Sequence, residues 1–236
     1  MGADETLSRL WSGGKSGSRG PKAALSVDQI VDAAVGIADT EGIDAVSMSR
    51  VGEALGCSAM ALYRHVSGKA QLLSLMVDAV AGLLPVPPRR GPWRDDLVAW
   101  TRAQIAGMVE RPWILELPLT AGVPGPCRMR WMEAGFEILG DFDLPGDDKL
   151  EILGLLAQYV LSATRLEVET RRSEELRATG DEWSSDFEQI LTDLADPAQF
   201  PHMFAAMGNR RGEKVDDDFG LQLILDGVAA HVARSA

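Results

Sequence analysis

The segment from residue 47 to 69, SMSRVGEALGCSAMALYRHVSGK, constrains the fold of this 236-residue chain more than any other. Gly56 lies at its centre, and glycine supplies the positive φ at which helices commonly end. Ser47 and Ser58 stand where each of two short helices would be capped. Apolar residues at helical spacing predict the inner faces of these helices, formed by Met48, Val51 and Leu55 and by Leu62 and Val66. This pattern predicts a helix-turn-helix, whose second helix enters the major groove of DNA.

The second of these helices lacks acidic residues, as does everything between Glu53 and Asp78, although the formal net charge of the chain is −12. Duplex DNA carries one negative charge per roughly 1.7 Å of its axis, so a surface without carboxylates favours contact with phosphate. Residues 15–69 hold six basic and six acidic side chains, and nearly all the negative charge therefore lies elsewhere. We expect the acidic remainder to repel DNA and to orient this segment toward it.

The segment LGCSAMALYRHVSGKAQLL resembles the DNA-reading segment of the tetracycline-repressor (TetR) family, whose pattern is close to L-G-V-S-x-x-x-L-Y-x-H-V-x-x-K-x-x-L-L. Cys57 stands at the usual valine, and the resemblance covers about residues 24–80. It implies an all-α protein with an N-terminal three-helix DNA-binding domain and a C-terminal helical domain for ligand binding and dimerisation. It further implies that a small, largely hydrophobic molecule binds the C-terminal domain, shifts the fourth helix and separates the two DNA-reading surfaces from their half-sites.

The candidate DNA contacts come from three places. Tyr63, His65 and Lys69 are expected to hold phosphates. Arg64 is the candidate for reading a guanine, although it could hold a phosphate instead. Ser58, Ala59 and Ala61 are expected near base edges. The remaining candidate contacts are Ser47, Met60 and a basic N-terminal arm with Lys15, Arg19 and Lys22. Residues 1–23 are either such an arm, reaching backbone or minor groove, or a flexible tail without a role.

The order of the motif and the predicted helices along the chain indicates a DNA-binding domain at 24–70 and a ligand-binding and dimerisation domain at 71–236. A helix at 26–42, with a capping box from Ser26 and Gln29, should form the floor of the first domain. A helix at about 68–84, capped by Ser67, should begin beside the phosphate contact of Lys69 and continue into the second domain. It would thereby connect DNA binding to that domain. Further helices are predicted at 93–110, 112–118, 127–140, 147–168, 184–195, 198–207 and 217–234.

The helices at 147–168 and 217–234 are apolar over most of their circumference. Such a helix must be buried on two sides, and a second subunit can supply one of them. We therefore expect a homodimer with a four-helix interface, the alternative being that both helices lie at the centre of a monomer.

A ligand pocket needs apolar walls with a few polar points. Polar residues on otherwise apolar helices, together with nearby large side chains, give the candidate set: Trp100, Gln104, Met108, Met132, Phe136, Gln158, Tyr159 and Thr164. Each polar member taken alone could equally be an ordinary hydrogen-bonded residue, and each apolar member a core residue.

No catalytic motif, metal-ligand spacing or cofactor signature is evident, so we expect neither an enzyme nor a bound cofactor or metal. There is no apolar run long enough to span a membrane and no secretory signal, and Cys57 and Cys127 stand alone, which together favour a cytoplasmic protein. The sequence thus predicts a DNA-binding transcriptional regulator, a repressor released by a small molecule. The alternatives are a helical small-molecule-binding protein or enzyme with a non-functional DNA-binding head, and an architectural DNA binder without a ligand.

Overall fold

The computed structural model describes residue 11 and residues 25–117, 124–178, 194–209 and 218–235. Every regular element within these ranges is helical, as the sequence predicts. The elements are α2 (Val27–Glu41), η1 (Ile43–Ala45), α3 (Met48–Ala54), α4 (Ala59–Leu62), α5 (Lys69–Leu83), α6 (Trp93–Val109), η2 (Pro112–Glu116), α7 (Pro126–Leu139), α8 (Gly146–Ala178), α10 (Pro201–Gly208) and α11 (Phe219–Ser235). The predicted helix at 184–195 lies largely outside the described residues, as do Lys15, Arg19 and Lys22.

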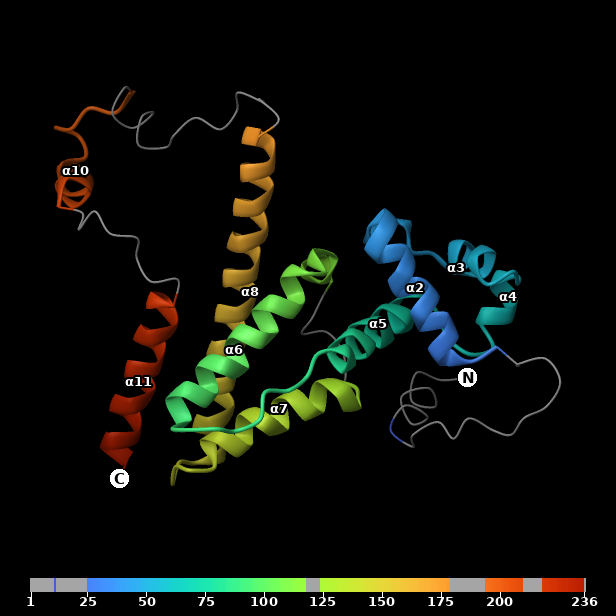
Figure 1. Cartoon of the computed structure of the whole chain (residues 1–236), viewed down its shortest axis with the longest axis horizontal. Helices are drawn as coiled ribbons and strands as arrows, with labels where there is room; N and C mark the ends of the chain where they lie inside the picture. Colours follow the sequence, from blue (N-terminus) through green and yellow to red (C-terminus); the bar gives the residue numbers. More distant parts are fainter. Residues whose placement is uncertain (1–10, 12–24, 118–123, 179–193, 210–217, 236) are drawn as a thin grey trace.

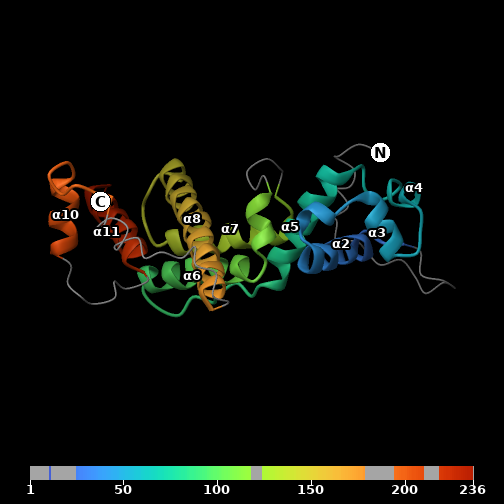
Figure 2. The same cartoon turned by 90° about the horizontal axis from the view of Figure 1, so that it is seen from above.

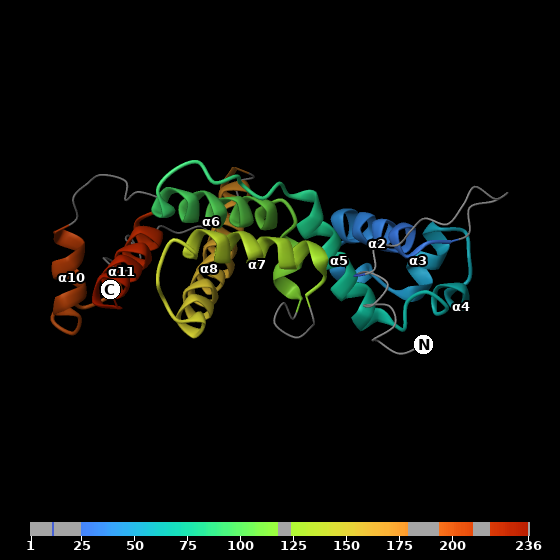
Figure 3. The same cartoon turned by 90° about the horizontal axis from the view of Figure 1, so that it is seen from below.

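The molecule is elongated, with α2, α3 and α4 at one end and α10 and α11 at the other (Figures 1, 2 and 3). We call α2, η1, α3 and α4 the head, and α6, η2, α7, α8 and α11 the body. Helix α5 lies between them, because it packs on α2 of the head and on α7 of the body. Within the body, α6 makes its most extensive contact with α8.

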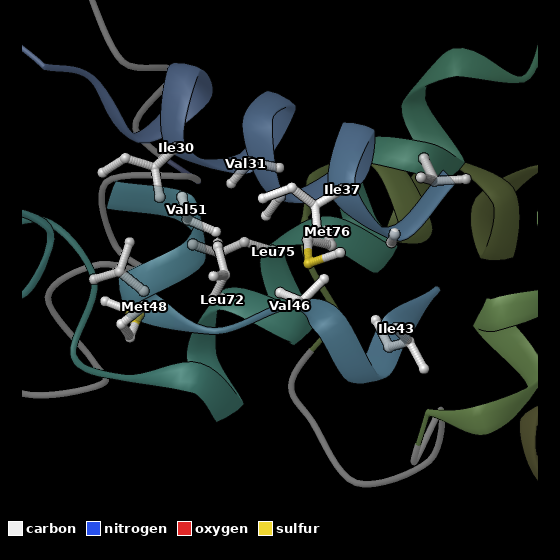
Figure 4. Packing of buried hydrophobic residues seen from close by; sticks show 14 of the residues in the cluster. Ile30, Val31, Ile37, Ile43, Val46, Met48, Val51, Leu72, Leu75 and Met76 are labelled. Atoms are coloured by element: carbon white, nitrogen blue, oxygen red, sulfur yellow. The ribbon is translucent and has the colours of Figure 1, made fainter. Parts of the chain in front are cut away.

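The head is built on α2. Ser26 caps this helix, since its hydroxyl accepts the Gln29 N–H at 3.1 Å and its own N–H donates to the Gln29 side chain at 3.0 Å. The helix ends at Gly42, whose φ is +86°. Its buried face meets α3 and α5 in one cluster of apolar side chains that converge from three helices (Figure 4). The predicted role of this helix as a floor is therefore what the packing shows.

The head's cluster extends beyond residue 70. Leu72, Leu75 and Met76 of α5 are buried in it, and so are Trp113 and Ile114 of η2. A second cluster, in the body, is formed by α6, α7, α8 and α11 around Trp100, Trp131 and other buried side chains. The η2 segment, which follows α6 of the body, thus completes the core of the head.

Three local predictions differ from the structure. Helix α8 continues to Ala178, ten residues past the expected end, because EVETRRSEELRA is rich in helix formers and Arg171 pairs with Glu167 one turn away at 2.6 Å. Helix α4 is shorter than predicted, and residues 63–65 continue it as hydrogen-bonded turns. Neither Ser58 nor Ser67 caps its helix through the side chain; α5 begins after Gly68, and the Gln71 side chain accepts the Ser67 N–H.

No helix within the described ranges is both long and apolar enough to cross a membrane.

Candidate nucleic-acid interface and ligand cavity

The turn between α3 and α4 is held by two glycines. Gly56 has φ +66°, as predicted for a helix stop. The Cys57 N–H donates to the Gly52 carbonyl at 2.9 Å, and a Cβ on Gly52 would lie 2.7 Å from the Cys57 carbonyl oxygen. Only glycine therefore allows this close approach of α3 to the start of α4. The sequence prediction did not single out Gly52. The signal that could have identified it is a glycine inside a predicted helix, where glycine is ordinarily unfavourable.

The predicted DNA contacts gather on one exposed surface around α4. Leu62 and Val66 are fully buried and anchor the segment to the head. The opposite side exposes five of the predicted contacts, Ser58, Met60, Tyr63, Arg64 and Lys69, and half-buries four more, Ser47, Ala59, Ala61 and His65. The Ser47 hydroxyl accepts the Arg50 N–H at 3.1 Å, and its own hydrogen can still be donated to another group.

The charges on this surface have different partners. Arg50 is held by Glu41 at 2.6 Å, and the pKa of that carboxyl is lowered because it accepts hydrogen bonds from the guanidinium. Across the part of the chain that the structure describes, Arg64 and Lys69 form no ion pair. Positive charge beside α4 is thus available to an external anion such as a phosphate.

A cavity of about 350 Å³ lies inside the body, where α5, α6, η2, α7 and α8 meet. Its lining includes five of the eight residues predicted for a ligand pocket, Trp100, Gln104, Met108, Met132 and Phe136. The lining residues are apolar apart from Gln104 and Arg128, and they include the indole side chains of Trp100 and Trp131. A size and composition of this kind are typical of small-molecule sites.

Both indole N–H groups of the wall are already used. Trp100 donates to the Trp131 carbonyl at 2.9 Å, and Trp131 donates to the Ala81 carbonyl at 3.1 Å. The Gln104 amide nitrogen donates to the Trp100 carbonyl at 3.3 Å, which leaves its carbonyl oxygen as an acceptor. The indoles therefore shape the cavity and fix α7 to α5 and α6.

The structure does not bring Gln158, Tyr159 or Thr164 to the cavity. Gln158 is exposed, and the Tyr159 ring packs toward α11, where a Cβ on Gly220 would lie 3.1 Å from it. Burial raises the pKa of the Tyr159 hydroxyl. Thr164 is fully buried and donates to the Val160 carbonyl at 2.7 Å. The sequence reasoning also missed Arg128, which lies four and eight residues before Met132 and Phe136 and therefore on the same face of α7.

Helix α5 is joined to the cavity wall through a buried carboxylate. Asp78 of α5 is 3% exposed, and it accepts the backbone N–H groups of Cys127 at 3.3 Å and Arg128 at 2.8 Å. It thereby caps the first turn of α7 from another helix. A Cβ on Gly125 would lie between 2.3 and 2.6 Å from the Asp78 carboxyl atoms, so a larger residue before α7 would have to displace this carboxylate.

A second joint connects the head to the body through η2. Asp39 of α2 accepts the Trp113 indole N–H at 2.8 Å and the Arg111 guanidinium at 3.2 Å. Ile114 is 4% exposed, belongs to the head's buried cluster and also lines the cavity. A change in cavity shape therefore has two contiguous routes to the head, through α5 and through η2.

The described residues contain no group of three or more His, Cys, Asp or Glu side chains arranged to hold a metal ion.

Comparison with known proteins agrees with this geometry. Residues 30–76 match the model for "Bacterial regulatory proteins, tetR family", and residues 84–232 match that for "Tetracyclin repressor-like, C-terminal domain". A curated relative, the HTH-type transcriptional repressor DrrR1 of Streptomyces coeruleorubidus, is 35% identical over 97% of this chain and 86% of its own.

Among solved structures, ActR of Streptomyces coelicolor is similar both in its apo form, with a TM-score of 0.72, and in complex with actinorhodin, with a TM-score of 0.75. Both are 25% identical to this chain and cover 91% of it and 100% of ActR. The match therefore extends over both the head and the body.

Proposed function

Because the chain belongs to the TetR family of DNA-binding transcriptional regulators, we propose that it is a repressor that binds operator DNA as a homodimer and leaves it when a small, largely apolar molecule fills the cavity. The observation that carries this proposal is that α5 begins beside the α4 surface, at Lys69, and lines the cavity farther along, at Val77, Val80 and Ala81. One rigid element is common to both places.

The proposed DNA contacts follow from exposure and charge. The second helix of a helix-turn-helix enters the major groove, so Arg64, Ser58 and Met60 would lie near base edges. Tyr63, His65 and Lys69 would hold the flanking phosphates. Arg64 is the candidate for discrimination, since a bidentate contact to guanine is worth about 1–3 kcal/mol.

The proposed release mechanism uses both joints. A ligand that widens the cavity displaces α5 and η2 relative to α7 and α8, because their side chains share its wall. The head follows, since α5 and η2 both contribute to its buried cluster. In a dimer this displacement changes the spacing of the two α4 surfaces, which must match two half-sites about one helical turn apart.

Exposed apolar side chains support the homodimer. Leu155 and Leu166 of α8 and Phe219 and Leu223 of α11 are each between 47% and 67% exposed in the single chain. Side chains of this size gathered on two helices mark an interaction surface. A symmetric pairing of α8 and α11 would bury them in a four-helix interface.

The relatives support the ligand and the direction of regulation. DrrR1 is named a repressor, and ActR has been solved with actinorhodin bound. We propose the same arrangement here, with a DNA-binding domain at 24–70, a ligand-binding and dimerisation domain at 71–236 and action in the cytoplasm, where the operator is. A polypeptide with this role needs no catalytic group, and its relatives are named as regulators.

Fluorescence polarisation with DNA flanking the protein's own gene tests the proposal. We expect specific binding that weakens linearly in log–log form as salt increases. The variant Arg64→Ala should bind less tightly and lose its preference at one operator position, whereas a phosphate role would weaken binding to all sequences alike. A helical ligand-binding protein with a non-functional head would show no preference for this DNA over an unrelated duplex.

A further inference from the structure

None of the four residues of α4 has a side chain that forms strong hydrogen bonds. The helix consists of Ala59, Met60, Ala61 and Leu62, and Leu62 is fully buried in the head. Ala59 and Ala61 are half-buried, whereas Met60 is 73% exposed. Met60 therefore forms most of the outward surface of this helix, and that surface consists of CH groups and a thioether sulfur, which accepts hydrogen bonds only weakly.

The surroundings of Met60 indicate what covers it. Helix α4 lies at the end of the molecule opposite α11 (Figure 3), with the exposed Arg64 and Lys69 nearby in the sequence. Neither cation forms an ion pair among the residues that the structure describes. No acidic residue occurs between Glu53 and Asp78. The rim of this surface is thus complementary to a polyanion, and a helix-turn-helix brings such a surface into the major groove.

The major groove offers one apolar feature to an apolar side chain. Every base pair presents hydrogen-bond donors or acceptors there, but only thymine adds a methyl group, on C5. A thioether chain placed over a donor or acceptor displaces its water without replacing the hydrogen bond. Against the thymine methyl it buries apolar surface on both partners, and its unbranched chain adapts to the position of that methyl.

We propose that Met60 recognises the C5-methyl group of a thymine in each operator half-site and so determines specificity at that base pair. This rests on the proposed function, since it identifies what one residue of the DNA-reading surface contacts. Arg64, about one turn farther along the segment, supplies hydrogen bonds to a different base pair or phosphate. The surface then reads one apolar and one polar feature of the DNA.

Deoxyuridine tests the proposal, because it differs from thymidine only in lacking this methyl group. Footprinting of the full-length protein on DNA flanking its own gene first locates the half-sites. Each thymine of one half-site is then replaced by deoxyuridine in synthetic duplexes, and affinity is measured by fluorescence polarisation at a fixed salt concentration. At one thymine position the wild-type protein should lose about fourfold in affinity, equal to about 0.8 kcal/mol for one buried methyl group.

Two substitutions at Met60 assign that loss to this side chain. Met60→Ala should bind the thymine duplex more weakly and should reduce the effect of deoxyuridine at that position to about 1.5-fold or less, because its side chain no longer reaches the methyl group. Met60→Leu keeps an apolar side chain of similar volume and should retain most of the fourfold effect.

Met129→Ala is the matched control. Met129 is also exposed, at 36%, but it lies on α7 of the body and outside the cavity lining. The variant removes the same atoms as Met60→Ala at a place away from α4. It should show the full wild-type response to deoxyuridine, and a response lost equally in both variants would overturn the assignment.

Two further results would overturn it. One is that no thymine of the half-site weakens wild-type binding when it is replaced. The other is that Met60→Ala weakens binding to the thymine and deoxyuridine duplexes alike, which would mean that the side chain packs on the sugar–phosphate backbone or is inserted between base steps. Specific binding to the flanking DNA without methyl dependence would sink only the present inference. No preference for this DNA over an unrelated duplex would contradict the proposed function and this inference together.

Discussion

Gly52→Ala and Gly36→Ala apply one substitution to two helices of the head and should have opposite effects. Gly52 lies inside α3, and a Cβ there would come 2.7 Å from the Cys57 carbonyl oxygen and 3.3 Å from the Ala59 nitrogen. Both are backbone atoms, which a rotamer change cannot move. Gly36 lies inside α2, is exposed, and has no atom within 4 Å of its added Cβ.

The expected changes in the free energy of unfolding combine helix propensity, which acts in both variants, with overpacking, which acts only in Gly52→Ala. Alanine is favoured over glycine in a helix interior by about 0.5–1 kcal/mol, and both variants gain this. Overpacking costs about 1–3 kcal/mol and applies only to Gly52→Ala. Gly36→Ala should therefore raise the free energy of unfolding slightly, and Gly52→Ala should fall about 1–3 kcal/mol below it.

Urea unfolding and operator titration measure the two consequences. The contact at Gly52 sets how closely α4 approaches α3, so its variant should bind operator at least about tenfold less tightly, equal to about 1.4 kcal/mol. Gly36→Ala should bind like wild type. If Gly52→Ala were as stable as Gly36→Ala and bound operator normally, the close approach of α3 to α4 would not be what positions the DNA-reading surface.

Three further substitutions test the joints and the surface charges. Asp39→Ala leaves the Trp113 indole N–H without its acceptor and should lower the free energy of unfolding by about 1–3 kcal/mol in urea, whereas a change near zero would show that this contact does not hold η2 to α2. Asp78→Ala uncaps α7 and should cost about 0.5–2 kcal/mol by the same assay; unaltered stability would argue against the cap. Glu41 has a lowered pKa beside Arg50, so its contribution to stability is present above the ordinary carboxyl pKa and is lost as pH falls through the lowered value. In Arg50→Gln, NMR titration should find the Glu41 pKa back at its ordinary value, and an unchanged pKa would count against the pair.

Local signals explain why the head could be predicted from the sequence. The Ser26–Gln29 capping box, the Gly56 stop and the helical spacing of Leu62 and Val66 each act within a few residues. Five pocket residues were found for a similar reason, because large side chains on inward faces of neighbouring helices converge. The end of α8 was missed because a polar composition was read as a break, whereas good helix formers and an ion pair sustain an exposed helix.

Long-range contacts explain what the sequence could not show. Asp78 and the first turn of α7 are 50 residues apart, and Asp39 and Trp113 are 74 apart. No local sequence pattern predicts such pairs, because each partner alone resembles a surface acid or a core aromatic residue. Tyr159 and Thr164 failed to reach the cavity for the complementary reason. They sit on the same helix as its wall but on faces that meet α11 or their own preceding turn.

The central claim is that the DNA-reading surface and the cavity wall form one mechanical unit. Binding free energies are reciprocal, so operator DNA must alter the cavity wall if a ligand in the cavity alters operator binding. Hydrogen exchange, measured with and without operator DNA, should show changed protection in the second half of α5 and in η2 as well as around α4. Changes confined to α2, α3 and α4, with the cavity wall unaffected, would contradict the account.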